Sequence, residues 1–328
     1  VFIDGRYRTQ VKAQVATDFT PVPWPEVSLA AWLKEHLPDG GVVGFDPWLH
    51  TPGQLETINA ELAGSNISLK AVGNLVDRIW PDQPPPPEEP ARVHPLEFAG
   101  ESHADKRNRL AQVLKSDGDK AALITLPDSL CWLLNVRGSD IPRNPVVQGF
   151  ALLHDDSTVE LFMNAAKLEG LQEHFGPEVT QRAPEVLIDR LKEILGPVRV
   201  DKNTAPKRLA DVLGDRARWG GDICALPKAR KNASEIAGAA AAHLRDGAAV
   251  VELLAWLAAQ APGSLSEIDV VQKLEGYRRQ DNALQDISFE TIAGTGPNGA
   301  IMHYRVTEGT NRPIKQGELY LVDSGGQY

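Results

Sequence analysis

The sequence is poor in cysteine, and this scarcity excludes two kinds of cross-linked protein. Only Cys131 and Cys224 occur among 328 residues, far apart and outside any Cys-x-x-Cys pattern. They predict neither a disulfide framework nor a thiolate zinc site. Such low cysteine usage is typical of a reducing compartment, and we expect a cytoplasmic protein.

Long apolar runs and an excess of positive charge are missing as well. No stretch approaches the roughly 20 apolar residues that a helix needs to cross a bilayer, so we expect no membrane partner. Lys and Arg number 34 against 44 Asp and Glu, which gives a formal net charge of -10. Because phosphate binding needs clustered basic side chains, we also expect no nucleic-acid partner.

The remaining composition is that of a multidomain globular protein. Hydrophobic residues make up 42% and charged residues 24% of the chain, a balance that supports well-buried cores. A length of 328 residues predicts two or three domains. Residues 81–90 contain four consecutive prolines and favour an extended connection, so we place a domain boundary at residue 90.

Strand-like and helix-like segments alternate on both sides of that boundary, which predicts two α/β domains, 1–90 and 91–225. In the first domain we expect strands at 1–3 and 42–45, and helices at 29–37 and from Pro52 onward. In the second we expect helices at 104–115 and 184–195, strands at 121–126 and 198–201, and a hairpin of 146–153 with 159–163.

The last region, 226–328, has a different pattern. Residues 231–260 lack proline and are rich in alanine and leucine, which predicts one long helix with Asn232 or Ser234 as N-cap. A second helix should run from a cap at Ser264 or Ser266 to about Arg279. Strands are expected at 287–293, 300–304 and 318–323. The predicted fold class is therefore α/β for the first two domains and α+β for the third.

Residues 294–299 match the GxGxxG pattern of dinucleotide-binding proteins. That pattern needs a following helix whose N-terminus receives the pyrophosphate, whereas 300–304 has a strand-like composition. We therefore expect a glycine-rich turn between two strands. The sequence contains no Walker A loop, HExxH helix or GxSxG elbow.

Three residues could carry chemistry, and each has a simpler structural explanation. His303 could hold a substrate carbonyl or move a proton, but a histidine on a strand is more often a hydrogen-bonded structural residue. Asp323 could be a metal ligand at a strand end, or a turn former before glycines. Arg6 could bind a substrate carboxylate or carbonyl, or form an ordinary ion pair.

Taken together and in order, several segments resemble the three-domain aminopeptidase P family of Xaa-Pro aminopeptidases. The segments are 2–7, 74–80, 132–140, Lys231-Asn232 with Glu235-Ile236, and His303-Tyr304 followed by 321–326. The resemblance covers nearly the whole chain. It implies two creatinase-like N-terminal domains followed by the start of a pita-bread metallopeptidase domain.

The resemblance also implies a reaction and a set of site residues. Members of this family remove the first residue from peptides with proline in the second position, with two divalent metal ions, in our expectation Mn²⁺. Asp323 matches the first metal aspartate, His303 a histidine that contacts substrate and takes part in catalysis, and Arg6 a substrate-binding arginine. The other four metal ligands should lie beyond Tyr328, because we expect the chain to be truncated at both ends. The resemblance further implies a homodimer.

Two other interpretations remain open from the sequence. A catalytically inactive pita-bread homologue could act as a peptide- or protein-binding module. A prolidase or creatinase would share the fold, although those enzymes have one N-terminal domain where this chain is predicted to have two.

Overall fold

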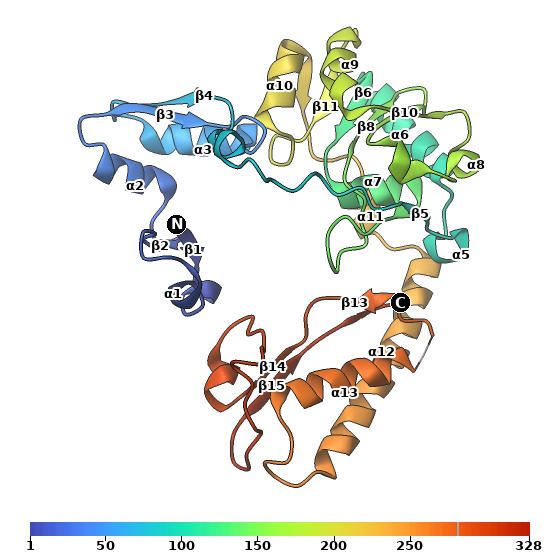
Figure 1. Cartoon of the computed structure of the whole chain (residues 1–328). Helices are drawn as coiled ribbons and strands as arrows, with labels where there is room; N and C mark the ends of the chain where they lie inside the picture. Colours follow the sequence, from blue (N-terminus) through green and yellow to red (C-terminus); the bar gives the residue numbers. More distant parts are fainter. Residues whose placement is uncertain (281) are drawn as a thin grey trace. The chain divides into compact units, whose positions relative to one another are not determined.

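The computed structural model describes residues 1–280 and 282–328, which separate into two compact units (Figure 1). One unit comprises Leu29–Glu235, and the other combines Val1–Ser28 with Ile236–Tyr328. Among the helices in these described residues, none is both long enough and apolar enough to cross a membrane.

A six-stranded sheet in the order β10-β9-β8-β6-β11-β12 forms the centre of the Leu29–Glu235 unit. The strands are β6 (Ala121–Ile124), β8 (Phe150–His154), β9 (Val159–Phe162), β10 (Val179–Arg182), β11 (Val198–Val200) and β12 (Ala217–Trp219). β8 pairs antiparallel with both β6 and β9, and the other pairs are parallel. The predicted hairpin is thus confirmed, although its first strand begins at Phe150 and not at Val146.

Helices cover both faces of this sheet. α6 (His103–Asp117) and α7 (Pro127–Leu134) share a core with Ile124, whereas α9 (Leu187–Glu193) and α10 (Lys207–Leu213) share a second core with Leu123. Adjacent residues of β6 enter opposite cores because side chains alternate across a strand. Both cores consist mainly of buried aliphatic side chains, with a few aromatic and sulfur-containing ones, and their burial stabilises the unit through the hydrophobic effect.

The same unit contains a smaller layer near its beginning. β3 (Gly41–Phe45) and β4 (Ile67–Ala71) pair in parallel and pack against α2 (Leu29–His36) and α3 (Pro52–Leu62). Thr51 caps α3 in a reciprocal capping box with Gln54. The unit also contains the short elements α4 (Leu75–Ile79), β5 (Arg92–Val93), α5 (Leu96–Ala99), β7 (Val136–Arg137), α8 (Gln172–Phe175) and α11 (Ala225–Ala229). Residues 81–90 form no helix or strand, as predicted.

The long predicted helix is confirmed as α12 (Ala233–Ala258). Its first residues belong to the Leu29–Glu235 unit, and the rest of the helix belongs to the second unit, which comprises Val1–Ser28 and Ile236–Tyr328. Asn232 is its cap, because the Asn232 side chain accepts from the Glu235 amide at 3.0 Å and the Glu235 carboxylate accepts from the Asn232 amide at 2.9 Å. α13 (Glu267–Arg279) follows with Ser266 as its cap. The two helices pack through Leu253, Val270 and Leu274.

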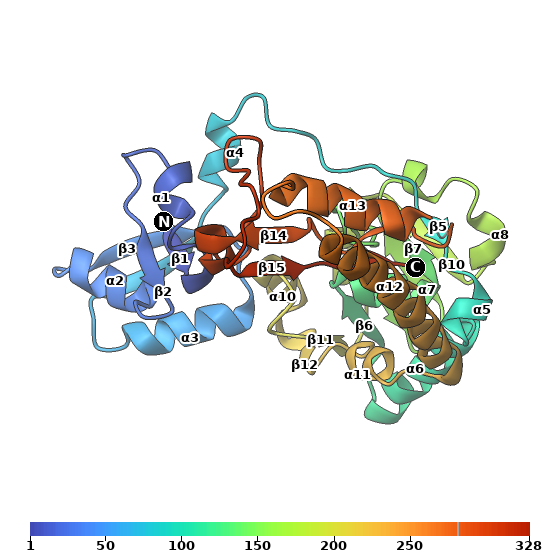
Figure 2. The same cartoon turned by 90° about the horizontal axis from the view of Figure 1, so that it is seen from below.

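The strands of this unit are short and pair in ribbons of two. β14 (Ile292–Thr295) pairs antiparallel with β15 (Tyr320–Asp323), and β13 (Asp286–Ile287) pairs with β16 (Gly326–Gln327). Figure 2 shows α13 running beside the β14–β15 ribbon, whose Tyr320 and Val322 pack on the α12–α13 core. At the beginning of the chain, β1 (Phe2–Asp4) pairs with β2 (Val22–Trp24), and α1 (Val11–Gln14) lies between them in sequence.

The predicted strand at 300–304 is wrong, and the one at 287–293 is divided between β13 and β14. After β14 the chain forms a short 3-10 helix, Gly296–Ala300, and then turns. Gly294 permits this path, since a Cβ there would lie 2.8 Å from the carbonyl carbon of Asn298. The glycines of the GxGxxG match therefore serve a close backbone approach. No α-helix follows them, so the dinucleotide-binding pattern is not formed. The expected glycine-rich turn between two strands is also wrong, because a 3-10 helix follows β14 and the next strand begins only at Tyr320.

Candidate active site

A cavity of about 550 Å³ in the second unit brings two of the three candidate residues together. His303 and Asp323 both line it, although they lie on different elements. Tyr7, Glu290, Tyr304 and Arg305 are also among its lining residues. The cavity thus combines two carboxylates, an imidazole, a guanidinium and two phenols, groups that can bind a polar substrate and transfer protons.

Asp323 is the last residue of β15, where pairing with Ile292 of β14 fixes its backbone. Its side chain is exposed and forms no hydrogen bond or ion pair with the residues that the structure describes. A carboxylate held on a strand and not engaged elsewhere is suited to a hard divalent cation. The described part of the chain contains no group of three or more His, Cys, Asp or Glu that could hold a metal ion. Asp323 fits as one ligand, and the described residues do not form a complete metal site.

His303 lies on the turn that follows the 3-10 helix, with a left-handed backbone at φ 51°. The Tyr7 hydroxyl forms a hydrogen bond of 3.0 Å with its Nδ1, and the two rings meet edge to face at 5.6 Å. This contact occupies Nδ1 and leaves Nε2 available. When the phenol donates, the proton of a neutral imidazole sits on Nε2, from which it can be donated to a carbonyl oxygen.

Arg6 is outside the described lining of this cavity and forms an ion pair with Asp4. Its Nε and Nη2 donate to the two carboxylate oxygens at 2.7 and 3.1 Å. The Arg6 side chain, together with its backbone N–H, lowers the pKa of Asp4 to about 2. The guanidinium carbon of Arg6 also lies 6.0 Å from the ring centre of Tyr7. Arg6 therefore lies next to the site, because Tyr7, the residue that follows it, lines the cavity.

Tyr7 is the site residue that the sequence did not single out. It lay within the segment 2–7, but its partner His303 is 296 positions away, and no local pattern predicts such a contact. Its position directly after Arg6 was the only available signal.

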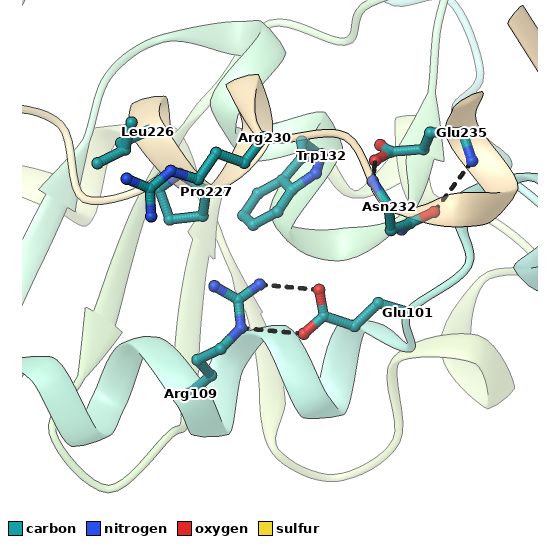
Figure 3. Close-up of a pocket in the computed structure, with 8 residues that line it drawn as sticks. All are labelled: Glu101, Arg109, Trp132, Leu226, Pro227, Arg230, Asn232 and Glu235. Carbon is teal, nitrogen blue, oxygen red and sulfur yellow. Dashed lines mark hydrogen bonds and ion pairs between the residues drawn. The ribbon is translucent and has the colours of Figure 1, made fainter.

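A second cavity, of about 320 Å³, lies in the Leu29–Glu235 unit and is shown in Figure 3. Trp132 lies between the Arg109–Glu101 ion pair and the segment that carries Arg230. The buried ammonium of Lys106 lies 4.5 Å from the Trp132 ring centre. None of the three candidate residues lines this cavity.

Two of the family-like segments meet at this second cavity, and both have structural roles there. The Asn232 amide group donates to the Ala99 carbonyl at 2.7 Å, while Asn232 and Glu235 form the capping box of α12. Lys106 donates to the carbonyl of Trp132 and to the side chain of Asn135, and burial lowers its pKa to about 8. Asn232 thus ties the first turn of α12 to α5, and Lys106 ties α6 to the C-terminal end of α7. The functional candidates remain His303 and Asp323.

Family models match the chain in three consecutive parts. Residues 1–79 and 82–235 each match a creatinase/prolidase N-terminal domain, and residues 233–328 match metallopeptidase family M24. With the mixed helix and strand content, these matches confirm the predicted fold class of creatinase-like N-terminal domains followed by a pita-bread domain. His303 and Asp323 both lie in the metallopeptidase match.

Similar proteins cover the chain from end to end. A probable Xaa-Pro aminopeptidase P of Aspergillus niger is 35% identical over 354 residues, which cover 99% of this chain and 56% of that protein. One of Coccidioides posadasii is 35% identical over 353 residues, with 99% and 53% covered. The chain thus spans about half the length of the curated relatives it matches.

Solved structures of Xaa-Pro peptidases also superpose on this chain. The X-prolyl aminopeptidase of Caenorhabditis elegans, described as a cytosolic enzyme with a di-nuclear active site, superposes with a TM-score of 0.91 at 29% identity. The superposition covers 100% of this chain and 56% of that one. The Xaa-Pro dipeptidase of Bacillus anthracis superposes with a TM-score of 0.53 at 19% identity over 69% of this chain and 62% of its own, a likeness of fold alone.

Proposed function

We propose that this chain belongs to the Xaa-Pro aminopeptidase P family and is part of a metal-dependent aminopeptidase that releases the first residue from peptides with proline in the second position. The observation that carries the proposal is the cavity in which His303 and Asp323 lie together within the metallopeptidase segment. We further propose three domains, 1–90, 91–225 and 226–328, and the three consecutive family matches support this division.

The proposed substrate has an unusual scissile bond. A proline in the second position makes that bond a tertiary amide without an N–H, so the contacts of ordinary aminopeptidases are lost. Binding must then depend on the carbonyl oxygen, the free N-terminus and the proline ring. A cavity with an imidazole, a carboxylate and apolar side chains such as Phe289 and Ile292 offers a partner for each of these groups.

Each site residue has a defined role in the proposal. Asp323 would contribute one carboxylate ligand, and two divalent ions, which we propose to be Mn²⁺, would supply an activated water and polarise the carbonyl. His303 donates a hydrogen bond from Nε2 to the carbonyl oxygen and stabilises the negative charge that develops there. Tyr7 holds the imidazole through Nδ1, and Arg6 contacts the peptide beside the site.

Two further parts of the proposal concern the setting of the enzyme. We place it in the cytoplasm, as a homodimer. The description of the Caenorhabditis elegans enzyme as cytosolic supports the first part, and so do the free, buried thiols of Cys131 and Cys224. Mass photometry or light scattering of the full-length protein would test the second.

The choice between an aminopeptidase and a prolidase can be tested with two substrates. Mn²⁺-loaded full-length protein is incubated with an Arg-Pro-Pro-type peptide and with an Xaa-Pro dipeptide, and the products are separated by mass spectrometry. We expect free arginine from the longer peptide. Cleavage of the dipeptide alone would replace our proposal by a prolidase, and no cleavage of either would favour an inactive binding module.

A further inference from the structure

Glu267 lies outside the cavity lining described above and forms an unusually complete set of hydrogen bonds. It is the first residue of α13, directly after the cap Ser266, and its side chain is fully buried. A buried carboxylate is costly unless each of its oxygens is hydrogen-bonded.

Among the residues that the structure describes, every hydrogen-bond partner of this carboxylate comes from the segment 295–312. One oxygen, Oε1, accepts from the Thr295 amide at 2.7 Å and from the Asn298 side chain at 3.0 Å. The other, Oε2, accepts from the same Asn298 group at 3.1 Å, from the Tyr304 hydroxyl at 3.0 Å and from the Arg312 amide at 3.3 Å. Glu267 therefore holds the segment at its beginning, its middle and its end.

His303 lies inside this segment, next to Tyr304, and its own backbone needs support. A left-handed conformation is unfavourable for a residue with a side chain and persists only where the surroundings impose it. Tyr304 is almost fully buried, and its hydroxyl also bonds to Thr310, so its position is fixed. Burial, the leading cause, raises the pKa of Tyr304, which keeps its phenol a hydrogen-bond donor.

We propose that Glu267 is a positioning residue, which through Tyr304, Asn298 and the two backbone amides keeps His303 at the cavity with its Nδ1 on Tyr7. The proposal rests on the proposed function, because it assigns Glu267 to the site of that reaction. Glu267 does not touch the reacting atoms and acts through the segment that it holds.

The chemistry of the contacts explains why a carboxylate is required. All of its partners donate, and a carboxylate is purely an acceptor. A glutamine has nearly the same shape but directs an N–H₂ group at two or more of these donors. Glu267→Gln should therefore loosen the segment without leaving a cavity.

The test compares full-length wild type with Glu267→Gln. We expect kcat for the Xaa-Pro peptide to fall about 10- to 100-fold with KM changed less than about threefold, since small displacements of a catalytic group act on the transition state. We also expect a shifted His303 imidazole resonance in NMR spectra and faster hydrogen exchange of the peptides that cover 295–312. Glu275→Gln, on the same helix and paired with Arg279, is the matched control and should behave as wild type.

Two further measurements separate the possible failures. Tyr304→Phe removes one donor of the network, and its effect on kcat should be less than additive with that of Glu267→Gln. If Glu267→Gln does not fold, Tyr304→Phe alone should show the same direction of change.

A wild type without peptidase activity would overturn the proposed function, while the resonance and exchange data would still test the positioning role. An unchanged His303 resonance and unchanged exchange in the folded variant would overturn that role.

Discussion

Replacing Asp323 by Asn in the full-length protein is expected to lower peptide cleavage more than about 100-fold. Asparagine keeps the shape but removes the charge that a divalent ion needs, and even changes to groups that only support a metal ligand cost roughly 10- to 100-fold. The folded structure should survive, because the Asp323 side chain is exposed and contacts no described residue through a hydrogen bond or ion pair. Initial rates at fixed Mn²⁺, with bound metal measured in parallel, would show the loss.

Glu308→Gln provides the control for this experiment. Glu308 is another exposed carboxylate of the same unit, and it does not line the cavity that holds His303. Its removal should leave the rate within about twofold of wild type, as expected for surface positions away from a site. If Asp323→Asn retained the wild-type rate, the assignment of Asp323 as a metal ligand would be wrong.

Asp246→Ala is expected to destabilise the second unit by about 3–5 kcal/mol, because it leaves a buried cation without its partner. The Arg278 side chain has no exposed surface and donates to Asp246 from Nε at 2.7 Å and from Nη2 at 2.9 Å. The Tyr328 hydroxyl donates to the same carboxylate at 2.8 Å. The loss would be measured as a lower urea midpoint of unfolding at an unchanged slope.

Two variants test whether the unpaired charge of Arg278 causes the loss of stability. Glu275→Ala breaks the more exposed pair with Arg279 on the same helix and should cost at most about 1 kcal/mol. The double change Asp246→Ala with Arg278→Met removes the unpaired cation and should recover much of the lost stability. If the double variant were as unstable as Asp246→Ala alone, lost packing and not an uncompensated charge would be the cause of the instability.

The helices of this protein could be predicted well because local signals define them. α12 and α13 were expected from composition and caps, and the structure confirms Asn232 and Ser266 as the capping residues. The strand expected at 300–304 failed for a tertiary reason. Gly294 lets the chain fold back onto β14 at a distance that no sequence pattern records, and this turn replaces the strand.

The candidate site was less accessible to sequence reasoning. His303 and Asp323 became candidates through a family resemblance, since each alone was better explained as a structural residue. Tyr7 contacts His303 although the two residues are 296 positions apart in the sequence. Glu267 bonds to residues of the His303 segment that are up to 45 positions away. A glutamate in the first turn of a helix is explained by the helix dipole alone, so its role in holding that segment becomes visible only in three dimensions.

Anomalous diffraction from Mn²⁺-soaked crystals of the full-length protein tests the central claim most directly. Our account predicts Mn²⁺ peaks in the cavity lined by His303, with a carboxylate oxygen of Asp323 within about 2.0–2.6 Å of an ion, the usual range for oxygen ligands of hard cations. Peaks that lie elsewhere and leave Asp323 without a metal would contradict the account.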